Sequence, residues 1–246
     1  MTDQLDQFPA GNELFGYRGV PGVHEDAPSI AVPWHQGDVC QDVELPGIGV
    51  GYALIFLHPC TLRRGAVLDE YVTMVEVRER HASKVMEGEK AWIKHWATGN
   101  YSLMPLPNML NAAKTGGTHV ADFRKIATVP SRELSRLDRV ATLSDDGRAY
   151  LLQRSFHHFS RVVVPLGDIR AGMRAVNLEI SLQQDWVEGA CRAAKGIEMA
   201  TVEQAEIDFD NYLKENDRRL RLGQLEEQAA VSKEVAYEIG RRFGVE

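Results

Sequence analysis

The apolar positions in the first half of the chain form short runs that are separated by glycine and proline. The clearest run, residues 51–57, is almost continuously apolar and is followed by Pro59. Short apolar runs bounded by turn residues are typical of strands that are buried on both faces. Similar or loosely alternating runs predict further strands over residues 39–45, 71–77, 101–106 and 119–128. Several short strands separated by turns predict a small barrel or a bent antiparallel sheet.

Apolar positions in the second half recur at helical spacing. Ser144 is a good N-cap, and the helix that follows it to about residue 163 has an apolar face that we expect to be buried. The positions of that face are Ala149, Leu152, Phe156, Phe159 and Val163. A short helix over residues 131–137 and longer ones over residues 81–99, 168–194, 201–222 and 224–243 are also predicted, with Thr201 and Gln204 as a capping box.

These elements predict an α+β protein with three regions. Residues 1–36 are rich in Gly, Pro, Asp and Gln and predict an extended arm. Residues 37–128 form the β-rich, barrel-like domain, and residues 129–246 form the helical region.

Composition narrows the functional class. The net charge of −7 over 246 residues argues against broad wrapping of nucleic acid but leaves room for a local basic groove. Three cysteines do not indicate a disulfide framework, and residues 1–13 are polar and acidic rather than a secretory signal. The longest apolar run, residues 49–57, is about half of a membrane span. We therefore expect a cytoplasmic protein without a membrane anchor.

An arginine loop, residues 58–65, follows the buried strand and carries the most unusual side chains. Arg63 and Arg64 are adjacent and can hold a phosphate or carboxylate by bidentate hydrogen bonds. Cys60 beside them would have its thiolate stabilised, so Cys60 and His58 are candidate catalytic residues. The alternative is structural, with Cys60 as a small buried residue and the arginines paired with nearby carboxylates.

A second cationic cluster lies on the helix that begins after Ser144. Arg154, His157, His158 and Arg161 stand at i, i+3, i+4 and i+7, so Arg154, one histidine and Arg161 share a face. We predict that Arg154, His158 and Arg161 bind the same anion as the arginine loop, and His157 is a further catalytic candidate. The alternative is a solvated outer face that pairs with acidic neighbours.

No metal or cofactor is expected from the motifs. The chain has no C-x-x-C or H-E-x-x-H pattern, no G-x-S-x-G elbow and no phosphate-binding glycine loop. Residues 228–236 have a helix-start pattern, but their mixed charge favours amphipathic helices that bind a partner over a DNA-reading motif. We therefore expect residues 166–246 to bind a protein partner or to mediate homo-oligomerisation.

The segment Gly37-Asp38-Val39, with the apolar strand that ends at Leu57-His58, resembles the PemK/MazF-type toxin family over about residues 37–80. This resemblance implies a small SH3-like barrel that opens with the Gly-Asp strand, in a family of dimeric RNA-cleaving toxins. Two positions depart from the family pattern. Gly51-Tyr52 stands in place of Arg-Pro, and His58-Pro59-Cys60 stands where the family usually has Ser or Thr. The helical second half has no counterpart in that family.

Three functions follow as hypotheses. The first is a prokaryotic or mobile-element protein whose barrel-like domain binds RNA or a phosphate-bearing ligand through the two cationic clusters. The second is a non-catalytic interaction subunit that uses its C-terminal helices. The third is a toxin-like ribonuclease in which Cys60 or a histidine is the nucleophile or general base.

Overall fold

The computed structural model describes residues 14–16, 33–57, 62–64, 67–80, 102–106, 109–110 and 118–244. The predicted helix over residues 81–99 and most of the predicted arm lie outside these residues. Among the described residues, no helix combines the length and the apolar character that a membrane crossing requires.

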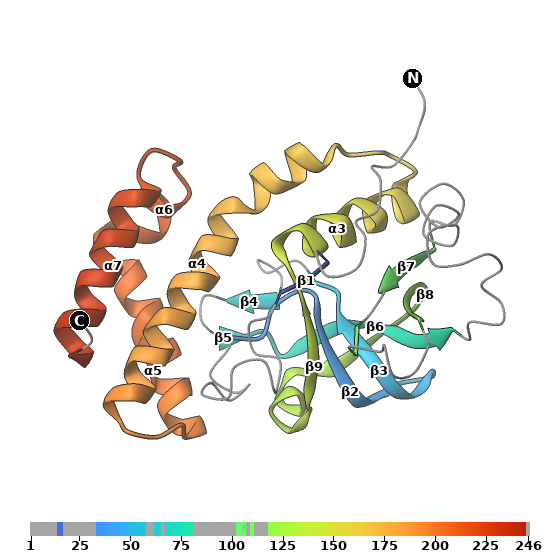
Figure 1. The fold of residues 1–246 in the computed structure, drawn as a ribbon, viewed down its shortest axis with the longest axis horizontal. Coiled ribbons are helices and arrows are strands. Elements are labelled where there is room, and N and C mark those ends of the chain that lie inside the picture. Colours follow the sequence, from blue (N-terminus) through green and yellow to red (C-terminus); the bar gives the residue numbers. More distant parts are fainter. Residues whose placement is uncertain are drawn as a thin grey trace.

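A curled antiparallel sheet of seven strands makes up most of the first half (Figure 1). Its strand order is β1-β9-β2-β3-β6-β8-β7, and β4 and β5 form a separate two-stranded ribbon. The strands are β1 (Phe15–Gly16), β2 (Asp38–Leu45), β3 (Gly49–Ile55), β4 (Arg63–Arg64), β5 (Val67–Leu68), β6 (Tyr71–Arg80), β7 (Leu103–Leu106), β8 (Thr118–Pro130) and β9 (Arg139–Leu143). The predicted α+β class and bent antiparallel sheet are therefore confirmed.

The sheet has a packed core on each face. Along the second half of β3, Leu54 belongs to the core on one face, and Ala53 and Ile55 belong to the core on the other. All three side chains have no exposed surface, as the continuous apolar run predicted. Leu151 from a helix closes the first core, whereas Leu134 closes the second.

The labelled α-helices, α3 to α7, follow the last strand, and those after α3 continue away from the sheet (Figure 1). Helix α3 covers one face of the sheet, and the long α4 leads from α3 to a helical bundle centred on the fully buried Trp186. The helical segments are η5 (Ser131–Arg136), α3 (Asp145–Ser160), α4 (Leu166–Ala193), α5 (Met199–Lys214), η6 (Glu215–Asp217), α6 (Arg218–Leu222) and α7 (Gln228–Phe243).

The helix boundaries differ from the prediction in the bundle. Helix α5 begins at Met199 without a side-chain cap, so the expected capping box at Thr201 is wrong. The expected helix over residues 201–222 is interrupted because Asn216 and Asp217 adopt left-handed backbone angles, with φ of 52° and 51°. Asn and Asp tolerate this conformation better than most residues, and it turns the chain into α6.

Helix α3 buries only the N-terminal part of the face that we expected to be buried. Its N-terminal cap is as predicted, because the Ser144 hydroxyl accepts a hydrogen bond from the backbone N–H of Gly147. However, Phe156 is 47% exposed and Phe159 is 60% exposed. The C-terminal part of α3 therefore presents aromatic side chains to solvent, and this determines the site described next.

Candidate functional site

A large bulge in β8 reshapes the sheet next to the end of α3. In the pairing of β6 with β8, Val77 faces Ala121 and Val75 faces Ile126, so residues 122–125 lie opposite Glu76 alone. Bulges redirect side chains and occur often beside functional sites. This bulge projects two exposed cations, Arg124 and Lys125. We call the surface around it the bulge patch, which comprises Phe56, Arg78, residues 122–125, His158, Phe159 and Arg161.

A buried carboxylate organises the cations of the bulge. Asp122 accepts hydrogen bonds from Nε and Nη2 of Arg124, at 2.8 and 2.6 Å, and from the backbone N–H of Arg124 at 3.2 Å. Arg78 approaches the same carboxylate at 3.4 Å. Burial alone raises the pKa of Asp122, but the hydrogen bonds and charges of Arg124 and Arg78 outweigh it and hold that pKa below its usual value. Asp122 is thus a fixed anion at pH 7.

A chain of aromatic contacts joins the bulge to α3. The Phe123 ring, which is buried, lies 5.7 Å from the Phe56 ring and 5.8 Å from the His158 ring. Phe159 contacts both of these neighbours, with ring centroids 4.7 Å from His158 and 6.2 Å from Phe56. The result is an exposed ring at Phe159 that packs on two partly buried rings, with the buried Phe123 ring behind them.

The end of α3 adds a cation to this surface. Arg161 is the C-cap residue, with φ of 61°, and its backbone N–H donates to the carbonyl of His157. Its side chain is exposed and forms no ion pair with the residues that the structure describes. Burial and the charge of Arg161 lower the pKa of His158, and Asp122 opposes them only in part. His158 is therefore neutral near pH 7.

The structure separates the residues of the predicted cationic stripe. His158 and Arg161 lie in the bulge patch, but Arg154 is 1% exposed and donates from Nε and Nη2 to the Leu103 carbonyl, at 3.3 and 3.1 Å. His157 is also buried. Neither Arg154 nor His157 forms the solvent-facing stripe that the helical spacing predicted, because α3 turns this side toward β7. Arg154 has a structural role here.

Most of the arginine loop lies outside the part of the chain that the structure describes. His58 and Cys60 lie outside the described residues, and for Arg63 and Arg64 the structure describes only the backbone of β4. Figure 1 places β4 on the side of the sheet toward α4, whereas α3 ends on the side of β7. The site is therefore built on the α3 side alone.

Several residues of the bulge patch were not predicted from the sequence. Asp122, Arg124 and Lys125 fall inside a predicted strand, where the sequence Asp-Phe-Arg-Lys breaks the alternation of apolar and polar positions. That interruption was the available sign of a bulge. Phe159 was expected in the core because its spacing matched the apolar face of α3.

The described residues contain no group of three or more His, Cys, Asp or Glu side chains that could hold a metal ion. The thiol of Cys40 is buried, and burial raises its pKa to about 12, so it is a poor nucleophile.

No family model, curated protein or solved structure matches this chain.

Proposed function

We propose that the protein binds single-stranded RNA through the bulge patch. The observation that carries this proposal is the exposed Phe159 ring, which packs on the partly buried rings of Phe56 and His158. Arg124 and Arg161 lie close enough to His158 for their charges to act on it. Proteins that bind single strands combine cations along the phosphate backbone with aromatic side chains on which bases stack. Single-stranded RNA offers unstacked bases for such a contact.

The local charge supports an anionic ligand. The patch and its border carry four cations and only two carboxylates, Asp122 and Glu76, although the whole chain has a net charge of −7. Lys125 pairs with Glu76 at 2.9 Å, and Arg161 has no carboxylate partner among the described residues. A small positive surface on an acidic protein favours a short segment of nucleic acid over extensive wrapping.

The direct test is Phe159→Ala, with binding of a fluorescein-labelled oligouridine followed by anisotropy. A stacked base contributes about 1–3 kcal/mol, so the dissociation constant should rise by roughly 5- to 150-fold. Tyr71→Ala on β6 is the matched control, since Tyr71 is 51% exposed and lies outside the patch. Equal affinity of Phe159→Ala and wild type, or no binding by wild type, would refute the proposal. Gel analysis of the same mixtures checks whether the RNA is cut.

A second candidate function is supported by the C-terminal helices. Leu220, Leu225 and Tyr237 expose 62–74% of their surface in or near α6 and α7. Exposed large apolar side chains favour a protein–protein contact in this region. Light scattering over a range of concentrations tests self-association, and a monomer at every concentration counts against it.

A further inference from the structure

The last turns of α3 place polar side chains inside and an aromatic side chain outside. Phe156 is 47% exposed, although its neighbours in the sequence are polar and buried. These buried neighbours are Gln153, Arg154, Ser155 and His157. Burial of an aromatic ring stabilises a fold, whereas burial of a polar group costs free energy unless new hydrogen bonds replace those to water. Packing alone would therefore favour the reverse pattern, and the exposed ring points to a contact outside the chain.

Phe156 stands three positions before Phe159, the exposed ring of the bulge patch. Residues three positions apart on a helix are neighbours on its surface, with Cβ atoms about 5–6 Å apart. Phe159 is 60% exposed, so two rings at neighbouring positions of α3 are open to solvent. Every base has a face that can stack on an aromatic ring, and proteins that bind single strands carry such rings for successive bases.

We infer that Phe156 is a second stacking position, so that the bulge patch together with Phe156 binds two successive bases of one RNA strand. The inference rests on the RNA binding proposed above and extends it to the length and conformation of the bound segment. Stacked bases in one strand are about 3.4 Å apart, which is less than the spacing of the two Cβ atoms. The two bases must therefore separate on binding, which a single strand allows more readily than a base-paired duplex.

The two stacking positions differ in the charges beside them. The cations of the bulge patch lie at the Phe159 end, where two of them act on His158. On the Phe156 side, Arg154 is 1% exposed and donates to the Leu103 carbonyl, so it is not open to a phosphate. Phe156 therefore adds affinity by stacking, without adding a phosphate contact or changing the dependence on salt.

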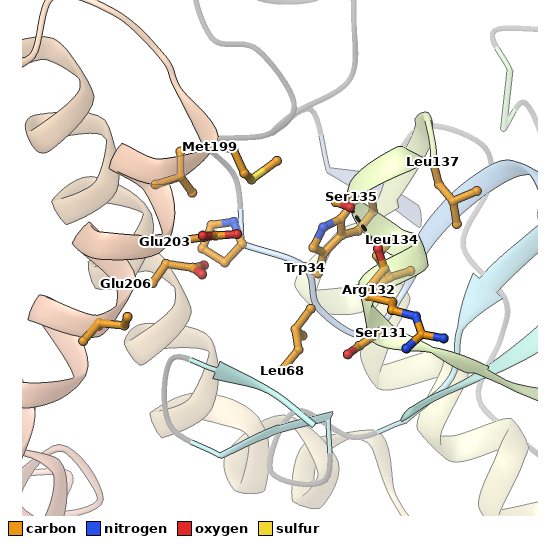
Figure 2. Close-up of a pocket in the computed structure, with 13 residues that line it drawn as sticks. Trp34, Leu68, Ser131, Arg132, Leu134, Ser135, Leu137, Met199, Glu203 and Glu206 are labelled. Carbon is orange, nitrogen blue, oxygen red and sulfur yellow. Dashed lines mark hydrogen bonds between the residues drawn. The ribbon is translucent and has the colours of Figure 1, made fainter. Parts of the chain in front are cut away.

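A groove on the other side of the fold is less suited to the second base. It has a volume of about 460 Å³ and separates α5 from η5 (Figure 2). Figure 2 shows the carboxylates of Glu203 and Glu206 extending into it from α5. Carboxylates repel the phosphates that accompany every base of a strand. The RNA site therefore extends along α3.

The experiment measures the anisotropy of two fluorescein-labelled tetranucleotides with the full chain. One is oligouridine, and the other carries a single uracil and is otherwise abasic, so both have the same phosphates. Phe156→Ala should raise the dissociation constant of oligouridine by roughly 5- to 150-fold, the range for one stacked base. The slope of log K against log salt should keep its wild-type value. Affinity for the one-base strand should not change, because its base takes the Phe159 position.

Conservative variants separate stacking from general apolar contact. Phe156→Tyr keeps an aromatic ring and should keep wild-type affinity, whereas Phe156→Leu has no ring and should bind about as weakly as Phe156→Ala. Tyr71→Ala on β6 and Met199→Ala in the groove remove exposed apolar side chains outside the site, so RNA affinity should stay unchanged.

Three results would overturn the inference and leave RNA binding at Phe159 standing. The first is wild-type affinity of Phe156→Ala for oligouridine. The second is an equal loss for the one-base strand, because Phe156 would then act through the first position. The third is wild-type affinity of Phe156→Leu, which would replace stacking by general apolar contact. If the wild-type protein binds neither strand, the proposed function fails together with the inference.

Discussion

Asp122→Asn tests whether the buried carboxylate limits how strongly the bulge patch holds an anion. Asparagine has nearly the same shape as aspartate, and its side-chain oxygen can still accept the hydrogen bond from the backbone N–H of Arg124. The substitution removes the negative charge that holds Arg124 and Arg78. One further positive charge then becomes available to phosphate, because Arg78 keeps its contact with Glu76 at 4.0 Å. We expect tighter RNA binding and a stronger dependence on salt.

The size of the effect follows from the charges. Four cations face two carboxylates in the wild-type patch, so about two phosphate contacts are expected, and log K should fall against log salt with a slope of about −1.4. Asp122→Asn adds about one contact and should steepen this slope to about −2.1. Between about 50 and about 200 mM salt, affinity would then fall roughly 7-fold for wild type and roughly 20-fold for the variant.

The assay is anisotropy of labelled oligouridine over a series of KCl concentrations. Glu133→Gln is the control because it changes the net charge by the same amount on η5, where Glu133 pairs with Arg132 and Arg136. Hydrogen bonds to a charged group contribute about 1.5–3 kcal/mol each, so the free energy of unfolding of Asp122→Asn is measured in urea to confirm that it is folded. An unchanged slope, or an equally steeper slope for Glu133→Gln, would show that Asp122 does not restrain the patch.

Four further substitutions separate structural residues from binding residues. Arg154→Met should lower the free energy of unfolding in urea by about 1–3 kcal/mol, because it leaves a buried carbonyl of β7 without its donor, and RNA affinity of the folded variant should not change. Burial lowers the pKa of His35 from 6.5 to about 4, so the unfolded chain binds more protons between these values and stability should fall by up to about 3 kcal/mol as pH drops from about 6.5 to about 4. His35→Gln should remove this part of the pH dependence of urea unfolding. Arg161→Gly should raise stability by roughly 1 kcal/mol, since glycine prefers the left-handed backbone at this position, yet reduce the salt slope of RNA binding by about 0.7. Lys195→Gly, at φ of 57° after α4, should give the same gain in stability and leave RNA binding unchanged.

Most strands were predictable because their burial follows the apolar pattern of the sequence. Strand β9 was missed because two of its inward side chains are polar. Arg139 forms a fully buried ion pair with Asp38 at 3.3 Å, and the Thr142 hydroxyl donates to the same carboxylate at 2.9 Å. When only hydrophobic periodicity is considered, a segment that contributes to a buried polar network has the same sequence pattern as a surface segment.

The prediction that the whole apolar face of α3 is buried was wrong at the C-terminal end of the helix, for a related reason. A long cation such as Arg154 can be buried when its guanidinium reaches a backbone carbonyl, and the partner carbonyl of Leu103 comes from a strand about 50 residues earlier. Periodicity within the helix contains no information about that partner. It also cannot show that the rings of Phe56 and Phe123 meet the end of α3 and support Phe159 outside the core.

Three departures from local sequence rules lie together in the bulge patch. They are the bulge of residues 122–125, the left-handed Arg161 and the exposed Phe159. Left-handed residues and exposed apolar side chains also occur elsewhere, as at Lys195 and Tyr237, so their presence in the patch does not by itself identify a binding surface. Each feature lowers stability relative to a regular strand, a glycine cap or a buried ring. Such a cost is retained where a function requires a particular arrangement of side chains. Arg161→Gly tests whether this holds in the patch, because stability should then rise while RNA binding weakens.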